Sequence, residues 1–206
     1  MKPVVLLAIC TLLSACSGQP ARPTKLTPDS YPWTLRQPHA FGKDFLWQQR
    51  LTARTGRRED SLTVALQKRG NVVTLVGLTP FNTKAFVLQQ DGDVVTFEAL
   101  VNREMPFPPR FILIDIQRTY LPLPSDATTP HDGVQTLELA GERVQQTFVG
   151  GQLSERRFER LDGKPAGTLR IRYQGWWPNG ATRKILLDNA WFGYSLVIET
   201  QSAVDL

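Results

Sequence analysis

Residues 62–78 have the sequence LTVALQKRGNVVTLVGL, in which apolar and polar side chains alternate at first. Leu62, Val64 and Leu66 occupy every second position, which is the period of a β-strand with one buried face. Arg69-Gly70-Asn71 then supplies turn-forming residues before a second apolar run begins. This segment therefore predicts two antiparallel strands joined by a short turn.

The same pattern continues on both sides of this hairpin, from Phe45 onward. Asp91-Gly92-Asp93 predicts a tight turn between strands at 85–89 and 94–100, because Asp-Gly accommodates positive φ angles. In the second half, strands separated by Gly, Asp, Asn and Pro are predicted at 134–139, 144–149, 153–161, 168–174, 185–187 and 194–200. The chain is thus predicted to be mainly β, with about ten antiparallel strands in a curved sheet around a core.

One segment departs from this period of two. Residues 109–120 carry Leu113, Ile116 and Tyr120 at spacings of three and four, which place them on one face of a helix. Prolines flank both ends of the run, as is typical of a helix that begins and stops sharply. We predict a helix whose apolar face lies in the mouth of the curved sheet, with a buried strand as the alternative.

The N-terminus has the pattern of a bacterial lipoprotein signal peptide. Residues 1–15 combine Lys2, an apolar run over residues 4–13 and small residues before Cys16. The run is too short for a membrane-spanning helix, which needs about 20 apolar residues. We expect cleavage before Cys16 and acylation of its thiol, which anchors the protein. Ser17, in place of an inner-membrane retention Asp, favours the periplasmic face of the outer membrane. An ordinary secretory signal is the alternative.

Cleavage at this point leaves 191 of the 206 residues, a size suited to one domain. Residues 16–40 contain five prolines among small and polar residues, which disfavours regular structure and predicts a lipidated tether. The remaining residues, 41–206, are predicted to form a single β domain. Tyr31 and Trp33 alternate near the end of the tether and are expected to fix it to the domain.

The composition gives little support to catalysis. His39 lies in the predicted tether and His131 in a predicted surface turn, and no thiol remains besides the acylated one. Neither a nucleophile motif nor a metal-binding spacing is present in the sequence. Paired carboxylates are the remaining route, if Asp115 or Asp188 meets Glu98 in space. We therefore expect no enzymatic activity, no cofactor and no metal.

The charge pattern indicates the kind of partner. The formal net charge is +5, and the basic residues are scattered in short pairs rather than in a stripe interleaved with aromatic residues. Nucleic acid is therefore not an expected partner, whereas a weak attraction to anionic lipid head groups fits this charge. We expect a monomer held at the membrane by its lipid anchor.

Several short motifs, taken in order, resemble the lipoprotein-receptor family LolB. The likeness is closest to uncharacterised lipoproteins of the LolA/LolB-like superfamily, some of them encoded beside lipid or aryl-polyene export systems. It spans roughly residues 45–200 and includes the proline-flanked central segment. The other motifs are Phe45-Leu46-Trp47-Gln48-Gln49, Gly77-Leu78-Thr79-Pro80-Phe81-Asn82, Gly175-Trp176-Trp177, Ile185-Leu186-Leu187 and Gly193-Tyr194-Ser195-Leu196.

This resemblance implies a half-open antiparallel β-barrel with one or two lid helices. It also implies an apolar cavity that accepts acyl cargo, a lipid or a lipoprotein, from a periplasmic LolA-like carrier or an exporter and passes it to the outer membrane. The chain departs from the receptor pattern in its shorter helical region and its proline-rich N-terminal segment. A glycolipid, a fatty acid or a polyene precursor is therefore as suitable a cargo as a lipoprotein.

A cavity for acyl chains needs bulky apolar side chains on the concave face of the sheet. The same alternation would also describe an ordinary filled core, so each candidate has a structural alternative. The predicted cavity-lining residues are Leu66, Val76, Phe86, Leu88, Phe97, Leu169, Ile171 and Tyr173 from the sheet, and Phe111 and Ile114 from the lid.

The turn after residue 78 is the most specific functional candidate. Pro80-Phe81-Asn82 places a large aromatic side chain at the predicted tip of a hairpin, flanked by polar residues. In the LolB family the matching loop carries a protruding apolar residue that enters the membrane, and the resemblance gives this role to Leu78 and Phe81. The alternative is that Phe81 folds back onto the core.

Two functions remain open at this point. One is a non-catalytic receptor that handles lipids, and the other is a structural lipoprotein that docks an envelope export system through its sheet edge. Trp176-Trp177 also has two interpretations. The pair forms an aromatic rim at a cavity mouth, or one tryptophan is buried in the core while the other covers a hairpin.

Overall fold

The computed structural model describes residues 31, 33–102, 108–123 and 132–206. Within these ranges the protein is mainly β, as predicted, with eleven strands, one α-helix and a short 3-10 helix. In chain order the elements are η2 (Pro38–Phe41), β1 (Phe45–Thr55), β2 (Arg58–Arg69), β3 (Val72–Leu78), β4 (Lys84–Asp91), β5 (Val94–Ala99), α1 (Pro109–Tyr120), β6 (Gly133–Leu139), β7 (Glu142–Val149), β8 (Gln152–Arg160), β9 (Thr168–Trp176), β10 (Thr182–Asn189) and β11 (Tyr194–Asp205).

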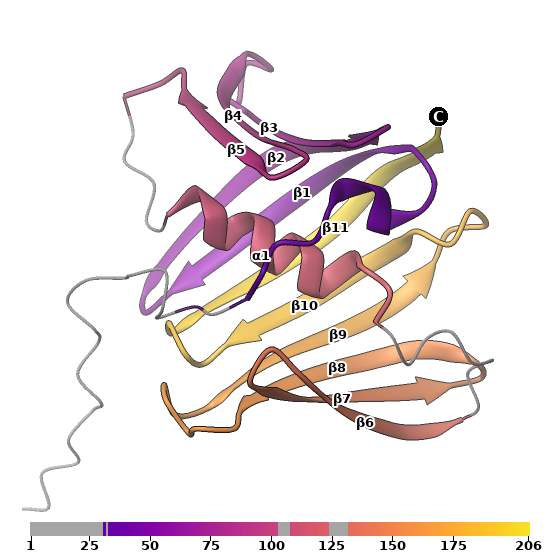
Figure 1. The fold of residues 1–206 in the computed structure, drawn as a ribbon. Coiled ribbons are helices and arrows are strands. Elements are labelled where there is room, and N and C mark those ends of the chain that lie inside the picture. Colours follow the sequence, from indigo (N-terminus) through magenta and orange to yellow (C-terminus); the bar gives the residue numbers. More distant parts are fainter. Residues whose placement is uncertain (1–30, 32, 103–107, 124–131) are drawn as a thin grey trace, which may run out of the picture.

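All eleven strands belong to one open antiparallel sheet, in the order β5-β4-β3-β2-β1-β11-β10-β9-β8-β7-β6. The chain runs outward from β1 to the β5 edge, passes through α1, and returns from the β6 edge to β11, which pairs with β1. Figure 1 shows the sheet curving around α1, which lies across its concave face. This is the half-open antiparallel arrangement that was predicted.

The strand that the sequence did not delimit is β1. Its inward-facing positions are Phe45, Trp47, Gln49 and Leu51, and the glutamine interrupts an otherwise apolar face. A polar residue at a buried position weakens the alternation on which the prediction depends. The observed sheet therefore has eleven strands where about ten were predicted.

The predicted helix is confirmed as α1, with the expected bounds. Pro109 occupies the first turn, where a missing N–H removes no intrahelical hydrogen bond. The backbone turns extended at Leu121, with ψ 138°, and Pro122 follows. The structure therefore excludes the alternative of a buried strand.

The core consists of two groups of apolar side chains on the concave face, one under each half of the sheet. Ile114 of α1 packs into the group formed by β7–β11, and Leu113 packs into the group formed by β1–β4. Tyr31 and Trp33 are 2% and 8% exposed and join the first group. The segment before η2 therefore packs beside α1, over the same face of the sheet.

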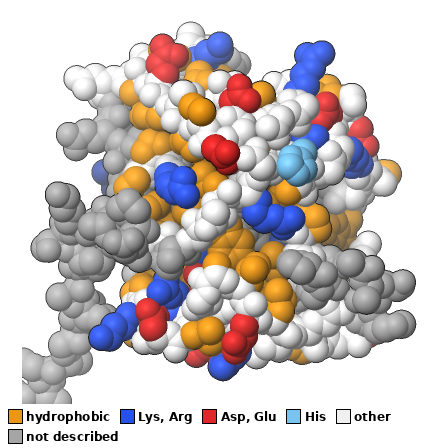
Figure 2. All heavy atoms as spheres, viewed as in Figure 1, with side chains coloured by type: hydrophobic (Ala, Val, Ile, Leu, Met, Phe, Trp, Pro, Cys, Tyr) orange, Lys and Arg blue, Asp and Glu red, His pale blue; other side chains and the backbone are white. Residues whose placement is uncertain are grey.

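The antiparallel pairing gives the sheet two distinct ends. The turns at 56–57, 79–83 and 190–193 share one end, which we call the Phe81 end. The turns at 70–71, 92–93 and 150–151 share the other, which we call the opposite end. Figure 2 shows the side of the molecule that carries α1, where hydrophobic side chains reach the surface among charged ones. In the described ranges, no helix is both long and apolar enough to cross a bilayer.

Candidate functional site

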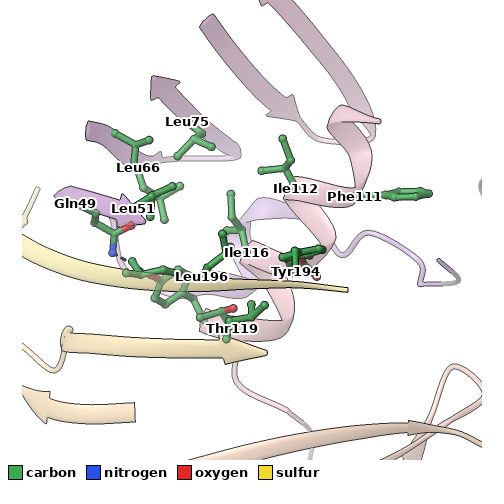
Figure 3. Close-up of a pocket in the computed structure, with 15 residues that line it drawn as sticks. Gln49, Leu51, Leu66, Leu75, Phe111, Ile112, Ile116, Thr119, Tyr194 and Leu196 are labelled. Atoms are coloured by element: carbon green, nitrogen blue, oxygen red, sulfur yellow. Dashed lines mark hydrogen bonds between the residues drawn. The ribbon is translucent and has the colours of Figure 1, made fainter. Parts of the chain in front are cut away.

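An apolar hollow lies between α1 and the concave face of the sheet (Figure 3). Its volume is about 90 Å³. Side chains from α1, β1, β2, β3, β10 and β11 line it, and most of them are apolar. The apolar lining consists of Leu51, Val64, Leu66, Leu75, Phe111, Ile112, Ile116, Tyr120, Leu187, Leu196 and Ile198.

Strand alternation explains why these walls are apolar. Val64 and Leu66 are buried on β2, and Leu75 is buried opposite Leu66 on β3. Because side chains two positions apart lie on one face of a strand, these neighbouring strands direct their apolar positions toward α1. Ile112 and Ile116, one turn apart on α1, face them across the hollow (Figure 3).

The remaining lining groups are polar: Gln49, Asp115, Thr119 and Tyr194. The Gln49 amide donates to the Tyr120 hydroxyl at 2.9 Å and to Thr200 Oγ1 at 3.1 Å, so these groups hold one another within the wall. The hollow is therefore mostly apolar, with a few hydrogen-bonded polar groups where the C-terminal half of α1 meets the sheet.

Charged groups are buried beside this part of α1, and one of them, Asp115, also lines the hollow. Asp115 accepts hydrogen bonds from the hydroxyls of Tyr31 and Tyr194. Burial raises the pKa of Asp115 to about 6, against the opposing effects of the Arg118 charge and the Tyr194 hydrogen bond. Burial likewise raises the pKa of Glu142 to about 7, although the charge of Arg118 opposes it.

The guanidinium of Arg118 is enclosed by aromatic rings. Its Cζ lies 4.3 Å from the ring centroid of Tyr31, 4.9 Å from that of Trp33 and 5.2 Å from that of Trp191. Its Nη2 is 2.5 Å from Glu142 Oε1. Aromatic faces and a carboxylate both favour the charged guanidinium, which offsets its removal from water.

Further hydrogen bonds fix the C-terminal end of α1 to the sheet. Arg156 of β8 donates to the carbonyl oxygens of Arg118 at 3.0 Å and Leu121 at 2.8 Å, which are groups that a helix leaves without intrahelical partners. The Tyr173 hydroxyl donates to the carbonyl oxygen of Thr119 at 2.8 Å. The polar contacts of α1 with the sheet thus lie from Asp115 onward, whereas its first turns pack through apolar side chains.

The structure separates the predicted cavity residues into groups. Leu66 and Phe111 line the hollow. Others are buried in the packed core and do not line it: Phe86, Leu88, Ile114, Leu169, Ile171 and Tyr173. Phe97 is half-buried on the edge strand β5, with its ring centroid 6.0 Å from that of Phe86.

Val76 requires a correction. On β3 the buried positions are Val73, Leu75 and Gly77, so Val76 points to the convex face, away from α1. Four of the five residues from 72 to 76 are apolar. The sequence therefore did not reveal whether the even-numbered or the odd-numbered residues of this strand face inward. Gly77 was the signal for the inward-facing set, because the ring of Phe86 on the paired strand β4 fills the space where a Gly77 side chain would lie.

Strands β1 and β11 also contribute lining residues that were not predicted from the sequence, including Leu51, Leu196 and Ile198. Their signal was the alternation within residues 45–55 and 194–205, together with the pairing of these two strands in the middle of the sheet. Cys16 and Ser17, the predicted sites of lipid attachment and sorting, lie outside the described residues.

The predicted membrane loop forms the tight β3–β4 turn. Thr79 closes it with a backbone hydrogen bond to Thr83 at 2.8 Å, and Asn82 adopts a left-handed φ of 59°. Phe81 is 88% exposed, so the alternative in which it folds back onto the core is wrong. Leu78, the other predicted residue, is half-buried at the end of β3.

The start of the described chain lies at the same end of the sheet as this turn. The ring of Tyr31 is 4.9 Å from that of Phe192, within the β10–β11 turn. That turn belongs to the Phe81 end, because Thr55 pairs with both Arg58 and Tyr194. Tyr31 and the exposed Phe81 therefore lie at the same end of the sheet.

The three carboxylates considered for catalysis are not brought together. Asp188 on β10 pairs with Arg172 at 3.0 Å, and Asp115 is engaged by tyrosine hydroxyls. Glu98 is exposed on β5, separated from β10 by five intervening strands. Among the described residues there is also no group of three His, Cys, Asp or Glu that could hold a metal ion.

The protein thus consists of a single curved sheet with a helix against its concave face and an apolar pocket between the two. The chain belongs to the family described as "Protein of unknown function (DUF3261)", whose model matches residues 46–202. No curated protein matches it.

Three solved structures are similar to this chain. A LolA superfamily protein from Nitrosomonas europaea has 11% identity and a TM-score of 0.46, with 85% of this chain and 89% of that one covered. A domain from Vibrio parahaemolyticus, provisionally assigned as an outer membrane lipoprotein-sorting protein, has 9% identity and a TM-score of 0.46, with 79% and 85% covered. A DUF1329 family protein from Desulfovibrio piger has 10% identity and a TM-score of 0.42, with 79% and 85% covered. The narrower likeness to LolB stays a prediction.

Proposed function

We propose that this protein is a lipid-anchored, non-catalytic envelope protein that binds acyl cargo under α1 and delivers it to the outer membrane. The observation that carries the proposal is the apolar hollow between α1 and the concave face of the sheet. An acyl chain needs no catalytic group in such a site. Its transfer depends only on the relative free energies of carrier, hollow and membrane.

The size of the hollow sets a condition on binding. At about 90 Å³ it is smaller than the cavity of about 150 Å³ that accommodates benzene, and much smaller than the roughly 300–1,000 Å³ of typical ligand sites. In this form it holds only the end of an acyl chain. A longer chain requires α1 to move away from the sheet.

The contacts of α1 favour movement at its N-terminal half. Phe111 and Ile112 lie there and contribute apolar surface, which an acyl chain can replace at about 0.8 kcal/mol per buried methylene. Movement at the other half would pull Arg118 away from Glu142. Separating two buried charges in this way is costly. We therefore propose that cargo enters beneath the first turns of α1.

The arrangement of the Phe81 end supports delivery to a bilayer. Fourteen residues lie between Cys16 and Tyr31, and the fifteen Cα–Cα steps across them span at most about 50 Å when fully extended. A lipid on Cys16, sorted to the outer membrane through Ser17, would hold this end near the membrane surface. Phe81, supported by Leu78, would then enter the lipid.

The structural role of a docking lipoprotein is the second candidate. It is favoured by the two open sheet edges, β5 and β6, where Val94 and Val134 are 63% and 64% exposed. Unpaired edges can add a strand from another chain. This function does not require cargo, so the presence of a bound amphiphile distinguishes the two candidates.

The test is native mass spectrometry and lipid extraction of residues 16–206 carrying Cys16→Ala, purified from envelopes without detergent. Leu196→Trp would fill the hollow, and Val197→Trp makes the same change at the next residue, which faces away. We expect a co-purifying amphiphile with the parent and with Val197→Trp, and its loss with Leu196→Trp. Its absence from the folded parent would refute the receptor function.

A further inference from the structure

A second hollow lies at the opposite end of the sheet, and its lining residues belong to β7, β8 and β9. Its volume is about 390 Å³, within the range of small-molecule sites. The hollow under α1 does not share its lining residues. The acyl-binding function proposed above therefore does not account for this second space.

Its wall includes a pair of parallel aromatic rings. Tyr173 and Trp176 have ring centroids 6.1 Å apart and an interplanar angle of 16°. The Tyr173 hydroxyl is engaged with the Thr119 carbonyl, and its side chain is 8% exposed. Trp176 is half-buried and lines the hollow, so it supplies the flat apolar surface that a ligand can reach.

Neutral polar groups surround this surface. Ser154 donates its hydroxyl to the Thr147 carbonyl at 3.0 Å, which leaves its oxygen free to accept a hydrogen bond. Gln152 is exposed and offers both a donor and an acceptor. Gly175 also lines the hollow; the aliphatic part of Arg183 lies 3.3 Å from where a Gly175 Cβ would be, and the Arg183 guanidinium lies over the Trp177 ring.

The chemistry of this wall selects among ligand classes. None of the described lining residues is Asp, Glu, Lys or Arg, so the wall offers no counter-charge to a phosphate or an ammonium group. It is too polar to suit a hydrocarbon chain. A sugar ring fits both parts, because its C–H face packs against an aromatic ring while its hydroxyls meet amide and hydroxyl partners.

We propose that this hollow binds a neutral sugar ring, with Trp176 as the stacking surface and Gln152 and Ser154 as hydrogen-bonding partners. The ring comes either from a free saccharide or from the head group of a glycolipid. This inference does not rest on acyl binding under α1, and the two can fail separately.

The test is an NMR titration of residues 16–206 carrying Cys16→Ala with three probes: methyl β-glucoside, octyl β-glucoside and octyl tetraethylene glycol. We expect both glucosides to shift the signals of Trp176 and Gln152. The glycol carries the same alkyl chain without a sugar and should leave them unmoved. A free-saccharide site would bind both glucosides equally, whereas a glycolipid site would prefer the octyl form.

Variants make the assignment specific. Trp176→Ala should weaken glucoside binding at least about tenfold. Trp177→Ala is the matched control, because Trp177 is the next residue, lies under Arg183 and does not line the hollow. Gln152→Ala removes an exposed side chain and should weaken binding without affecting folding. No glucoside-induced shift in the parent, or equal losses in both tryptophan variants, would overturn the proposal.

Discussion

Arg118 of α1 and Glu142 of β7 form an ion pair of 2.5 Å in which both side chains are fully buried. Aromatic rings enclose the guanidinium on several sides. A buried ion pair adds little net stability compared with apolar groups of similar size. Loss of one partner, however, leaves the other charge buried away from water and uncompensated. The pair therefore fixes the C-terminal half of α1 to the sheet.

Glu142→Ala should lower the free energy of unfolding by about 3–5 kcal/mol, because it deletes the buried hydrogen-bond acceptor of the Arg118 guanidinium and leaves the more distant Asp115, at 3.9 Å, beside that charge. The matched control is Glu138→Ala, which removes a partner of Arg143 at 3.8 Å in an exposed pair and should cost less than about 1 kcal/mol. Urea denaturation monitored by tryptophan fluorescence measures both. Similar losses in the two variants would contradict the structural role of the buried pair.

The raised pKa values of Asp115, about 6, and Glu142, about 7, predict how stability varies with pH. A carboxyl with a raised pKa in the folded state binds its proton more tightly there than in the unfolded chain. Its contribution to stability is therefore fully present below the unfolded pKa, near 3.8 to 4.5, and is lost as pH rises through 6 and 7.

Comparison with Asp115→Asn isolates one of these groups. The variant keeps a side chain that can hydrogen-bond to Tyr31 and Tyr194 but cannot titrate. Its unfolding free energy should fall less steeply than that of the parent between pH 4.5 and 7. Parallel curves for the two proteins across this interval would show that Asp115 titrates normally in the folded state.

The strands and the helix were predictable because their signals are local. Alternation in residues 62–66 and the turn chemistry of Asp91-Gly92-Asp93 each need only neighbouring residues, and the structure has β2 and the β4–β5 turn at these positions. Flanking prolines likewise delimit α1. A single helix between two runs of strands then has the concave face of the sheet as the place to bury its apolar side.

The buried charges were not predictable in this way. Asp115, Gln117 and Arg118 interrupt the apolar run at helical spacing, and this pattern alone does not show that they are buried. All three are buried because the segment around Tyr31 and Trp33 covers that side of α1. The partner Glu142 is 24 residues away from Arg118, and no local pattern relates the two.

The lipid-free chain is residues 16–206 carrying Cys16→Ala. Its binding to phosphatidylglycerol-containing vesicles should weaken about tenfold or more with Phe81→Glu, because burial of a phenylalanine side chain contributes about 1.5–3 kcal/mol. Val94→Glu is the control, because Val94 is also exposed but lies at the opposite end of the sheet. Vesicle co-sedimentation measures both. Equal binding by the two folded variants would remove the membrane role of the β3–β4 turn.

Amide hydrogen exchange should be uneven along α1. The amides of Gln117 and Arg118 lie where the helix is tied to the sheet by buried polar contacts, whereas Leu113 and Ile114 lie in the half held by apolar packing. We expect faster native-state exchange at Leu113 and Ile114 than at Gln117 and Arg118. Uniform protection along the helix would contradict entry of cargo beneath its first turns.

The most direct test of the hollow under α1 is a methyl NMR titration of the lipid-free chain with decanoate. We expect shifts at Leu51, Leu66 and Ile116, which line the hollow, and none at Val76 on the convex face. Leu196→Trp should abolish the shifts and Val197→Trp should preserve them. Saturating decanoate that leaves Leu51, Leu66 and Ile116 unmoved, or that shifts Val76 equally, would contradict the claim that this protein holds acyl chains between α1 and its sheet.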